Sequence, residues 1–428
     1  MLRTQAAACS VVVVAASILL PALASAQDTP QADETPAISL RWRNRPSIQI
    51  GEHVRLDIRL KLSYDWREFD PDIDEDDSDW RVRRTGINGQ ISDDIQFEIE
   101  HDLNSDGRWR DVYANWSTFR QFEVRGGRFK VPFGRETLTS ITDIDFAFRA
   151  LTSSVITPSR DTGVMVHGRF LRRGLTYEVG VFDDDGDNGE LVGEQFSVRG
   201  EVEDIGPSFA GRVTATPLRP LAGTFANLRV GAAYGQARVP EGLNSFIGST
   251  VYGTAEFFEP VYVKGRRSRM GVEFTYTPGP VGLTAEWMQA REQRKNQGLG
   301  DDDLSDVVTT GWYAAATWLL TGEDKENFNN PRDSLFAGGF GAVEVAARIE
   351  KLGFESVDKT GPASRDPRAE HIYPNSNTVW SIGVNWFMNR WVRVTLNAIH
   401  EELDDPQRTT IPGVTGYWSG LGRLQLVF

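Results

Sequence analysis

The stretch Val54 to Trp66, VRLDIRLKLSYDW, alternates strictly between apolar or aromatic residues at even positions and polar or charged residues at odd positions. Successive side chains of a strand point to opposite faces, so this stretch predicts a two-faced β-strand. In a soluble sandwich the apolar row faces a core. In an outer-membrane barrel it faces lipid, and the charged row faces a water-filled interior. One strand is compatible with either fold.

The N-terminal sequence MLRTQAAACSVVVVAASILLPALASAQ places Arg3 before an apolar run and ends in small residues. It predicts a secretory signal peptide over residues 1–26, cut before Gln27. The alternative, a membrane anchor, needs a longer run than one broken at Pro21. The only cysteine is Cys9, so the mature chain is expected to contain no disulfide, Cys-based metal site or thiol nucleophile.

The chain has 46 Lys and Arg against 60 Asp and Glu, a net charge of −14, which argues against nucleic acid as a partner. Beyond the signal, no apolar run approaches the ~20 residues of a membrane helix, so a helical membrane protein is excluded and a barrel is not. Residues 27–47, with three prolines and scattered charge, are expected to form a periplasmic leader.

From residue 48 to 428 roughly sixteen segments alternate as strands do, and an even number of strands is what a closed bacterial barrel requires. The connectors between them alternate between short and long, as periplasmic turns and external loops do. The long connectors are 68–79, 131–160, 183–208, 237–260, 289–308, 353–377 and 401–418. One connector, 321–338, is long where a short turn is expected.

Aromatic residues gather where strand ends are expected, as in the interfacial girdles of membrane barrels. They are Tyr64, Trp66, Trp80, Trp116, Tyr276, Trp287, Trp312, Trp318 and Trp386. The chain ends LGRLQLVF, which alternates to a terminal Phe428 and is similar to the C-terminal strand signal of outer-membrane proteins. That signal implies the barrel-assembly machinery as a partner.

The strongest local signature is GRFKVPFGRETL, residues 127–138, followed by TPSRDTGVMVHG, residues 157–168. Together these segments resemble the phosphate-selective porin O and P family. Further matches are GWYAAATWLLTGE at 311–323, GAVEVAARIEKL at 341–352 and GVNWFMNRWVRV at 383–394. The resemblance implies an all-β, 16-stranded antiparallel transmembrane β-barrel, a homotrimer, whose third external loop folds inward to narrow the pore. It also allows a long late turn to enter the lumen.

The resemblance further implies that basic side chains at the constriction select small anions such as phosphate. Arg suits phosphate because its planar fork donates hydrogen bonds in pairs. The candidate pore-lining residues are Arg59, Arg83, Arg212, Arg229, Arg269 and Arg393 on the wall, with Lys130, Arg135, Arg149 and Arg160 at the inward loop. Arg55, Lys61, Arg81, Arg125 and Arg423 share the predicted lumen register.

Acidic residues in the same places leave the ion preference open. The inward loop holds Glu136, Asp143 and Asp145, and the predicted lumen register contains Asp57, Glu98, Glu100, Glu178, Glu273, Glu286, Glu344 and Glu350. The acidic external loops either bind divalent cations or remain solvated. A general or cation-favouring porin is therefore the first alternative, and a soluble, secreted all-β binding protein or enzyme is the second.

Enzymatic motifs are not found: the five His residues have no local Ser signature, and neither GxxxxGK nor HExxH occurs. We therefore expect a passive diffusion channel of the Gram-negative outer membrane, in contact with membrane lipids and without cofactor or metal.

Overall fold

The computed structural model describes residues 38–42, 44–69, 74, 76–104, 107–171, 174–187, 206–221, 223–405, 407, 413 and 415–428. The expected signal peptide, residues 1–26, lies outside the described residues, as does most of the expected leader.

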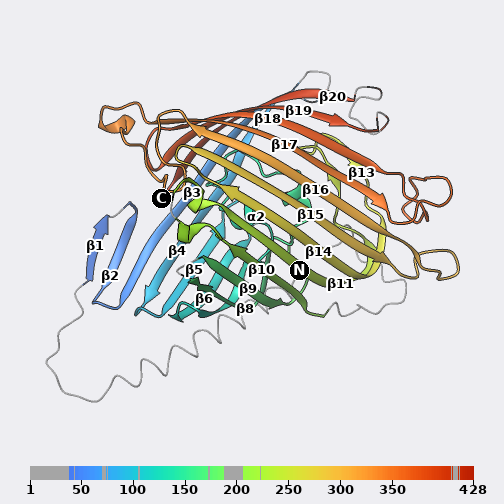
Figure 1. Ribbon diagram of the computed structural model, residues 1–428, viewed down its shortest axis with the longest axis horizontal. Helices are drawn as coiled ribbons and strands as arrows, with labels where there is room; N and C mark the ends of the chain where they lie inside the picture. Colours follow the sequence, from blue (N-terminus) through green and yellow to red (C-terminus); the bar gives the residue numbers. More distant parts are fainter. Residues whose placement is uncertain are drawn as a thin grey trace, which may run out of the picture.

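The chain forms one large antiparallel sheet that closes on itself as a barrel (Figure 1). Each wall strand pairs with its sequence neighbour, and β20 pairs with β3 to close a ring of sixteen strands. The first eight are β3 (Val54–Phe69), β4 (Asp77–Ile91), β5 (Ile95–Asp102), β6 (Trp109–Phe119), β7 (Phe122–Lys130), β8 (Arg160–Phe170), β9 (Leu175–Phe182) and β10 (Ser208–Ala215). The others are β11 (Arg229–Leu243), β14 (Tyr262–Tyr276), β15 (Val281–Arg294), β16 (Leu304–Leu319), β17 (Ala342–Ser356), β18 (Asn375–Phe387), β19 (Val392–Leu403) and β20 (Gly416–Val427).

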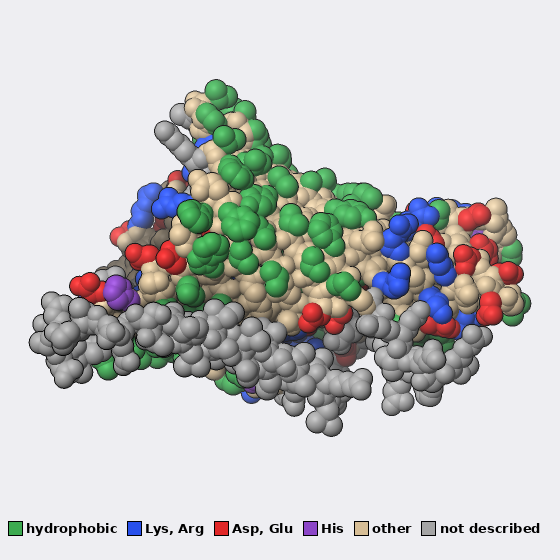
Figure 2. Space-filling model, turned by 90° about the horizontal axis from the view of Figure 1, so that it is seen from below, with side chains coloured by type: hydrophobic (Ala, Val, Ile, Leu, Met, Phe, Trp, Pro, Cys, Tyr) green, Lys and Arg blue, Asp and Glu red, His purple; other side chains and the backbone are tan. Residues whose placement is uncertain are grey.

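The alternating sequence has the consequence expected for a membrane barrel. In β18, Trp380, Ile382 and Val384 are exposed on the outer face. The alternate residues Val379 and Ser381 are buried inside. Figure 2 shows such hydrophobic side chains spread over the middle of the wall, with charged side chains gathered toward both ends. Among the described residues, no helix is long and apolar enough to cross a membrane.

The ring closes at the chain's end. Phe428 and Leu60 exchange backbone hydrogen bonds of 2.9 and 3.0 Å, just beyond the last register pair, Val427 with Lys61. The terminal alternation that predicted a final strand is therefore used to seal the barrel.

Long connectors lie at one barrel end and mostly short turns at the other, which by the rule for outer-membrane barrels are the external and periplasmic ends. Two periplasmic connectors are long. One, 320–341, contains η4 (Leu335–Ala337) and was expected to be an exception. The other, 216–228, contains η2 (Arg219–Leu221) and η3 (Thr224–Asn227). Of the external loops, 131–159 carries α2 (Arg135–Leu138) and α3 (Leu151–Val155), and 244–261 carries β12 (Gly248–Ser249) and β13 (Glu256–Phe258).

A hairpin of β1 (Ile38–Trp42) and β2 (Pro46–Ile50) extends the sheet at the periplasmic end. Because β2 pairs with β3, from Ser47 with Asp57 to Ile50 with Val54, the sheet continues across the boundary expected between the leader, 27–47, and the barrel, from 48. The Trp42 ring lies 6.4 Å from that of Trp391 and 6.3 Å from that of Phe428.

Apolar side chains fill part of the barrel interior. Apolar side chains on the inner face of β14 to β20 pack with apolar side chains of the external loops into one core. It includes Phe133, Leu151, Ile156, Phe246, Phe257, Val263, Met288, Leu352, Phe354 and Ile399.

Candidate functional site

The third external loop, residues 131–159, leaves β7 at a sharp bend. Pro132 is the second residue after the strand, and Gly134 adopts a φ of 73°, a conformation that favours glycine. A Cβ at Gly134 would also lie 2.8 Å from Thr157 and 2.9 Å from Met288 on β15. This PFG sequence is thus required by the geometry that turns the chain away from the wall.

Two carboxylates of the opposite wall hold the loop's short helices. Glu286 on β15 accepts hydrogen bonds from the backbone N–H groups of Arg135 and Glu136 at the start of α2, the latter at 3.0 Å. Glu350 on β17 accepts from the Leu151 N–H at the start of α3 at 2.6 Å. The first N–H groups of a helix lack intrahelical partners and attract anions. These acids are therefore buried under the loop and occupied by it.

Between its helices the loop reaches β18, β19 and β20. Asn385 donates to the Asp145 carbonyl at 2.7 Å, Arg393 to the Ile144 carbonyl at 3.1 Å and Gln425 to the Thr142 carbonyl at 3.0 Å. The loop begins on β7, so these hydrogen bonds connect it to strands that are far from β7 in the sheet order.

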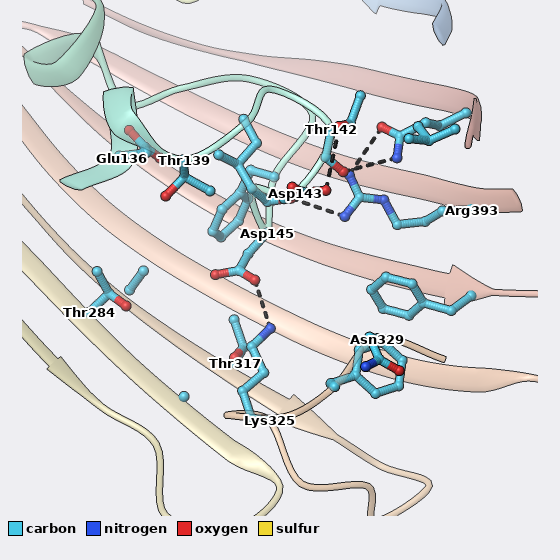
Figure 3. Close-up of a pocket in the computed structure, with 18 of the residues that line it drawn as sticks. Glu136, Thr139, Thr142, Asp143, Asp145, Thr284, Thr317, Lys325, Asn329 and Arg393 are labelled. Carbon is cyan, nitrogen blue, oxygen red and sulfur yellow. Dashed lines mark hydrogen bonds and ion pairs between the residues drawn. The ribbon is translucent and has the colours of Figure 1, made fainter. Parts of the chain in front are cut away.

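A cavity of about 440 Å³ opens on the periplasmic side of the loop. Its lining includes the periplasmic ends of the strands, the long turn 320–341 and loop residues 135–146, with five basic and three acidic residues. Figure 3 shows Lys325 of the turn directed at Asp145 of the loop. We call this space the periplasmic cavity.

Lys325 ties the turn to the loop and to the wall. Its ammonium group donates to Asp145 at 2.7 Å and also to Glu344 on β17. Burial alone would raise the pKa of Asp145, but Lys325 outweighs it and holds that pKa below its ordinary value. Burial likewise opposes the charge on Lys325, and the two carboxylates nevertheless raise its pKa. The contact is an ion pair at neutral pH.

A second cavity, of about 690 Å³, lies between the loop and the wall from β3 to β10. It reaches the external connector at Asn104 and Gly107. Eleven Lys and Arg side chains line it against four Asp and Glu. The basic ones are Arg59, Lys61, Arg81, Arg84, Arg108, Arg110, Arg125, Lys130, Arg149, Arg160 and Arg212. We call this space the basic cavity.

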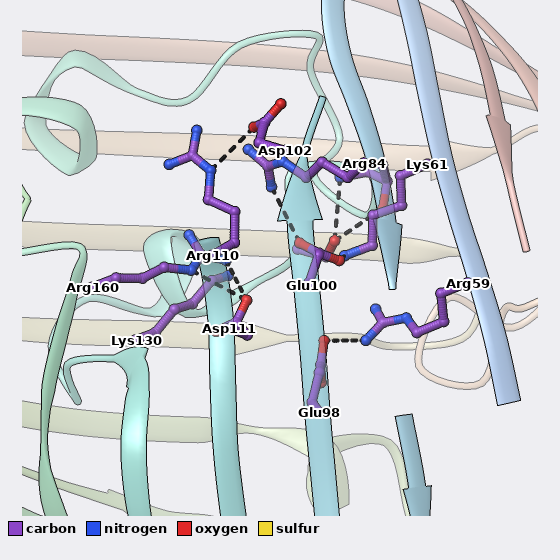
Figure 4. Close-up of polar contacts among 12 residues, drawn as sticks. Arg59, Lys61, Arg84, Glu98, Glu100, Asp102, Arg110, Asp111, Lys130 and Arg160 are labelled. Carbon is purple, nitrogen blue, oxygen red and sulfur yellow. Dashed lines mark hydrogen bonds and ion pairs between the residues drawn. The ribbon is translucent and has the colours of Figure 1, made fainter. Parts of the chain in front are cut away.

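Six of these cations are paired with carboxylates. Figure 4 shows Arg59 with Glu98, Lys61 with Glu100, Arg84 and Arg110 with Asp102, and Arg160 with Asp111. Arg212 bridges Glu178 and Glu273, at 2.7 Å each. These ion pairs hold the six cationic groups in fixed positions at the wall.

The other five form no ion pair with a carboxylate among the described residues. Two of them hold the loop through carbonyl oxygens. Lys130 donates to Leu138 at 3.0 Å and Thr139 at 2.8 Å, and Arg149 donates to Thr139 at 2.7 Å and to Glu136. Burial, opposed by Glu136, lowers the Arg149 pKa to about 10, so its guanidinium is charged at neutral pH. Arg125 stacks over the Tyr113 ring at 4.4 Å. Arg81 and Arg108 complete this unpaired group.

The structure places the ten candidate residues in three groups. Those that line the basic cavity are Arg59, Lys130, Arg149, Arg160 and Arg212. Arg135 and Arg393 line the periplasmic cavity. Arg83, Arg229 and Arg269 line neither of the two cavities.

Each of these three arginines lies outside the two cavities. Arg83 pairs in register with Leu62, whose side chain belongs to the outward row, and donates to Asn104 at 2.8 Å. Arg229 lies at the periplasmic rim, 3.3 Å from Glu326. Arg269 is buried and donates to Asp185 and to the Ile156 carbonyl, so it holds two loops together.

Arg84, Arg108 and Arg110 line the basic cavity and were not among the residues proposed from the sequence. A register shift beside Tyr64 exchanges inward and outward positions near the external end of β4, so Arg84, in register with Lys61, faces inward in place of Arg83. A similar register shift occurs between Ile99 and His101 on β5, opposite the part of β6 that contains Arg110. A bulge is invisible in a single sequence, so the alternation of residues alone could not place Arg84 inward.

Comparison with known proteins agrees with this architecture. The family model described as phosphate-selective porin O and P matches residues 54–428. No curated protein matches the chain. Among solved structures, an anion-selective porin from Comamonas acidovorans is similar with a TM-score of 0.55 at 13% identity, covering 88% of this chain and 100% of that one. OmpT of Vibrio cholerae gives 0.56 at 13% identity, over 89% and 99% of the two chains.

At these identities the solved structures show the fold alone, and the family follows from the sequence model that covers all sixteen wall strands. This protein belongs to the phosphate-selective porin O and P family and is a channel of the Gram-negative outer membrane.

Proposed function

We propose that this channel is a passive pore for small hydrophilic solutes that prefers anions, phosphate among them. The observation that carries the proposal is the lining of the basic cavity, where eleven cationic side chains meet four acidic ones. Between low-dielectric walls, one unit charge at ~4 Å is worth several kcal/mol, against about 1 kcal/mol in bulk water.

The acids of the wall cancel only part of this charge. Glu286, Glu344 and Glu350, which share the lumen register, are buried and hydrogen-bonded to the loop or to Lys325. Of the remaining lumen acids, Glu98 and Glu178 face the basic cavity in ion pairs with Arg. The anion-selective porin of similar fold is compatible with this proposal.

Planar-bilayer recording of the detergent-extracted protein tests it. Across a KCl gradient, the sign of the reversal potential should report preference for chloride, and phosphate added to the bath should reduce the chloride current in a concentration-dependent way. A reversal potential of the opposite sign would instead establish the alternative, a cation-favouring porin. Chloride preference without phosphate block would limit the channel to general anion selectivity.

We also propose a homotrimer. The family resemblance supports it, and so does the β1 edge strand, which among the described residues pairs with β2 alone and exposes Ile38, Leu40 and Trp42. Sedimentation of the detergent-solubilised protein should give three chains per particle, and a particle of one chain would contradict the proposal.

For export and assembly, we propose that residues 1–26 are removed and that the barrel-assembly machinery recognises β20 through Phe428. N-terminal sequencing should begin at Gln27. Deleting Phe428 should lower the fraction of protein that becomes inserted in the membrane, whereas unchanged insertion would place the signal elsewhere.

A further inference from the structure

A group of cations lies on the outer, lipid-facing surface of the barrel at its external end. Arg238 on β11 and Arg266 on β14 are both exposed, and they occupy directly opposite register positions on the same face. Lys295 is also exposed, and a Cβ at Gly265, the residue before Arg266, would lie 3.6 Å from the Lys295 Cδ atom. We call Arg238, Arg266, Arg291 and Lys295 the outer basic patch.

The patch is poorly neutralised. Arg291 pairs with Asp306 at 2.7 Å, but Arg238, Arg266 and Lys295 form no ion pair among the described residues. The nearby Glu241 is bonded to Lys264 and Arg368. Like charges directly opposite each other on neighbouring strands destabilise a sheet, so an anion between or beside the two arginines would relieve their repulsion.

The patch also has a defined depth in the membrane. Four register positions toward the middle of the wall, the pair Tyr234 and Met270 is exposed and apolar, and belongs to the lipid-facing band. The arginines lie about 13 Å further along the strands. Figure 2 shows basic side chains gathered beyond one end of this hydrophobic band. That is the level of lipid headgroups, with acyl chains beside Tyr234 and Met270.

We propose that the outer basic patch binds the phosphate groups of an outer-leaflet glycolipid, lipopolysaccharide. Arg238 and Arg266 form the phosphate site, with Lys295 and Arg291 at its edge. Arginine forks bind phosphate through paired, charge-assisted hydrogen bonds. The site lies outside the pore, so it is independent of the ion preference proposed above.

Native mass spectrometry of the solubilised protein, titrated with purified lipopolysaccharide, tests this. The wild type should retain the glycolipid, and the double variant Arg238→Gln/Arg266→Gln should bind it about tenfold more weakly or worse. Arg238→Lys/Arg266→Lys should keep part of the affinity. Arg120→Gln, which removes an equally exposed cation at the periplasmic rim, is the matched control and should bind as the wild type does. Wild-type conductance of each variant in a bilayer verifies the fold.

Two further probes separate the sources of phosphate. Dephosphorylated glycolipid should bind the wild type as weakly as intact glycolipid binds the double variant. Inorganic phosphate at equal concentration should not displace the intact glycolipid. The proposal is overturned by wild-type affinity in the double variant, by equal binding of the dephosphorylated lipid, or by displacement with inorganic phosphate, which would make this a free-anion site.

Discussion

Arg125 and Arg269 differ at the scale of single residues in what surrounds their charge, although both lie on inward-facing strand positions. Arg125 lines the basic cavity, lacks a carboxylate partner among the described residues and stacks on Tyr113. Arg269 is 2% exposed and satisfied by Asp185 and a loop carbonyl. An unpaired charge in a water-filled cavity acts on ions, whereas a buried pair acts on stability.

Replacing Arg125 by Gln should therefore lower anion preference and leave the fold intact, because the variant removes one uncompensated charge from the cavity. The ratio of chloride to potassium permeability in a KCl gradient should fall severalfold. Arg229→Gln, which removes an Arg at the periplasmic rim that lines neither cavity, is the control. An unchanged ratio in Arg125→Gln would move the filter away from this part of the wall.

Arg269→Met should show the opposite pattern. Removing one partner of a buried ion pair leaves Asp185 without part of its compensation and typically costs about 3–5 kcal/mol. We expect the free energy of unfolding in urea, measured by tryptophan fluorescence, to fall by this order while the permeability ratio stays at the wild-type value. A changed permeability ratio with unchanged stability would instead show that Arg269 contributes to ion selection.

The long turn 320–341 and the third loop are coupled at the scale of elements by Lys325. Replacing Lys325 by Met leaves Asp145 and Glu344 facing each other without their shared cation. We expect the loop to become less well fixed, which should appear as larger open-channel current noise. Asn330→Ala is the control, since Asn330 lies in the same turn and also lines the periplasmic cavity. Its open-channel current noise should equal that of the wild type.

The same contact has a defined pH window. The Asp145 pKa is lowered from 3.8, so the stabilisation by its charge is present above that value and is lost as pH falls through the lowered pKa. The Lys325 pKa is raised from 10.5, so its contribution is present below that value and is lost as pH rises through the raised pKa. Wild-type noise should be constant between these limits and rise outside them; a change near pH 7 would implicate another group.

Local periodicity made most of the elements predictable. The strict alternation of β3 and the ordering of short and long connectors specify a barrel because both are local properties of the chain. Two kinds of feature could not be predicted from the sequence. A register shift beside Tyr64 placed Arg84, not Arg83, in the basic cavity. The burial of Glu286 and Glu350 under α2 and α3 depends on contacts between residues more than a hundred positions apart. Such contacts cannot be inferred from one sequence alone.

The charges of the whole molecule are segregated, and the segregation explains how an acidic chain can form an anion pathway. The net charge is −14, yet the basic cavity has an excess of cations. Long external connectors contain DDDGDNGE and DDDLSD, and wall acids on β15 and β17 are covered by the third loop. The field that a permeating ion meets is thus set by the lining and not by the net charge.

This arrangement makes a prediction about ionic strength. The Debye length shortens from about 10 Å at 0.1 M salt to about 3 Å at 1 M, which is shorter than most separations across a cavity of this size. Anion preference that arises from a wall of distributed charges should therefore weaken severalfold between these concentrations, when measured as the permeability ratio at a fixed KCl gradient. A single tight anion site in contact with the ion is screened far less, because no mobile ion fits between the partners. Preference that stays constant up to 1 M KCl would contradict distributed selectivity and place the filter at Lys130 and Arg149, which both donate to carbonyl oxygens of the third loop.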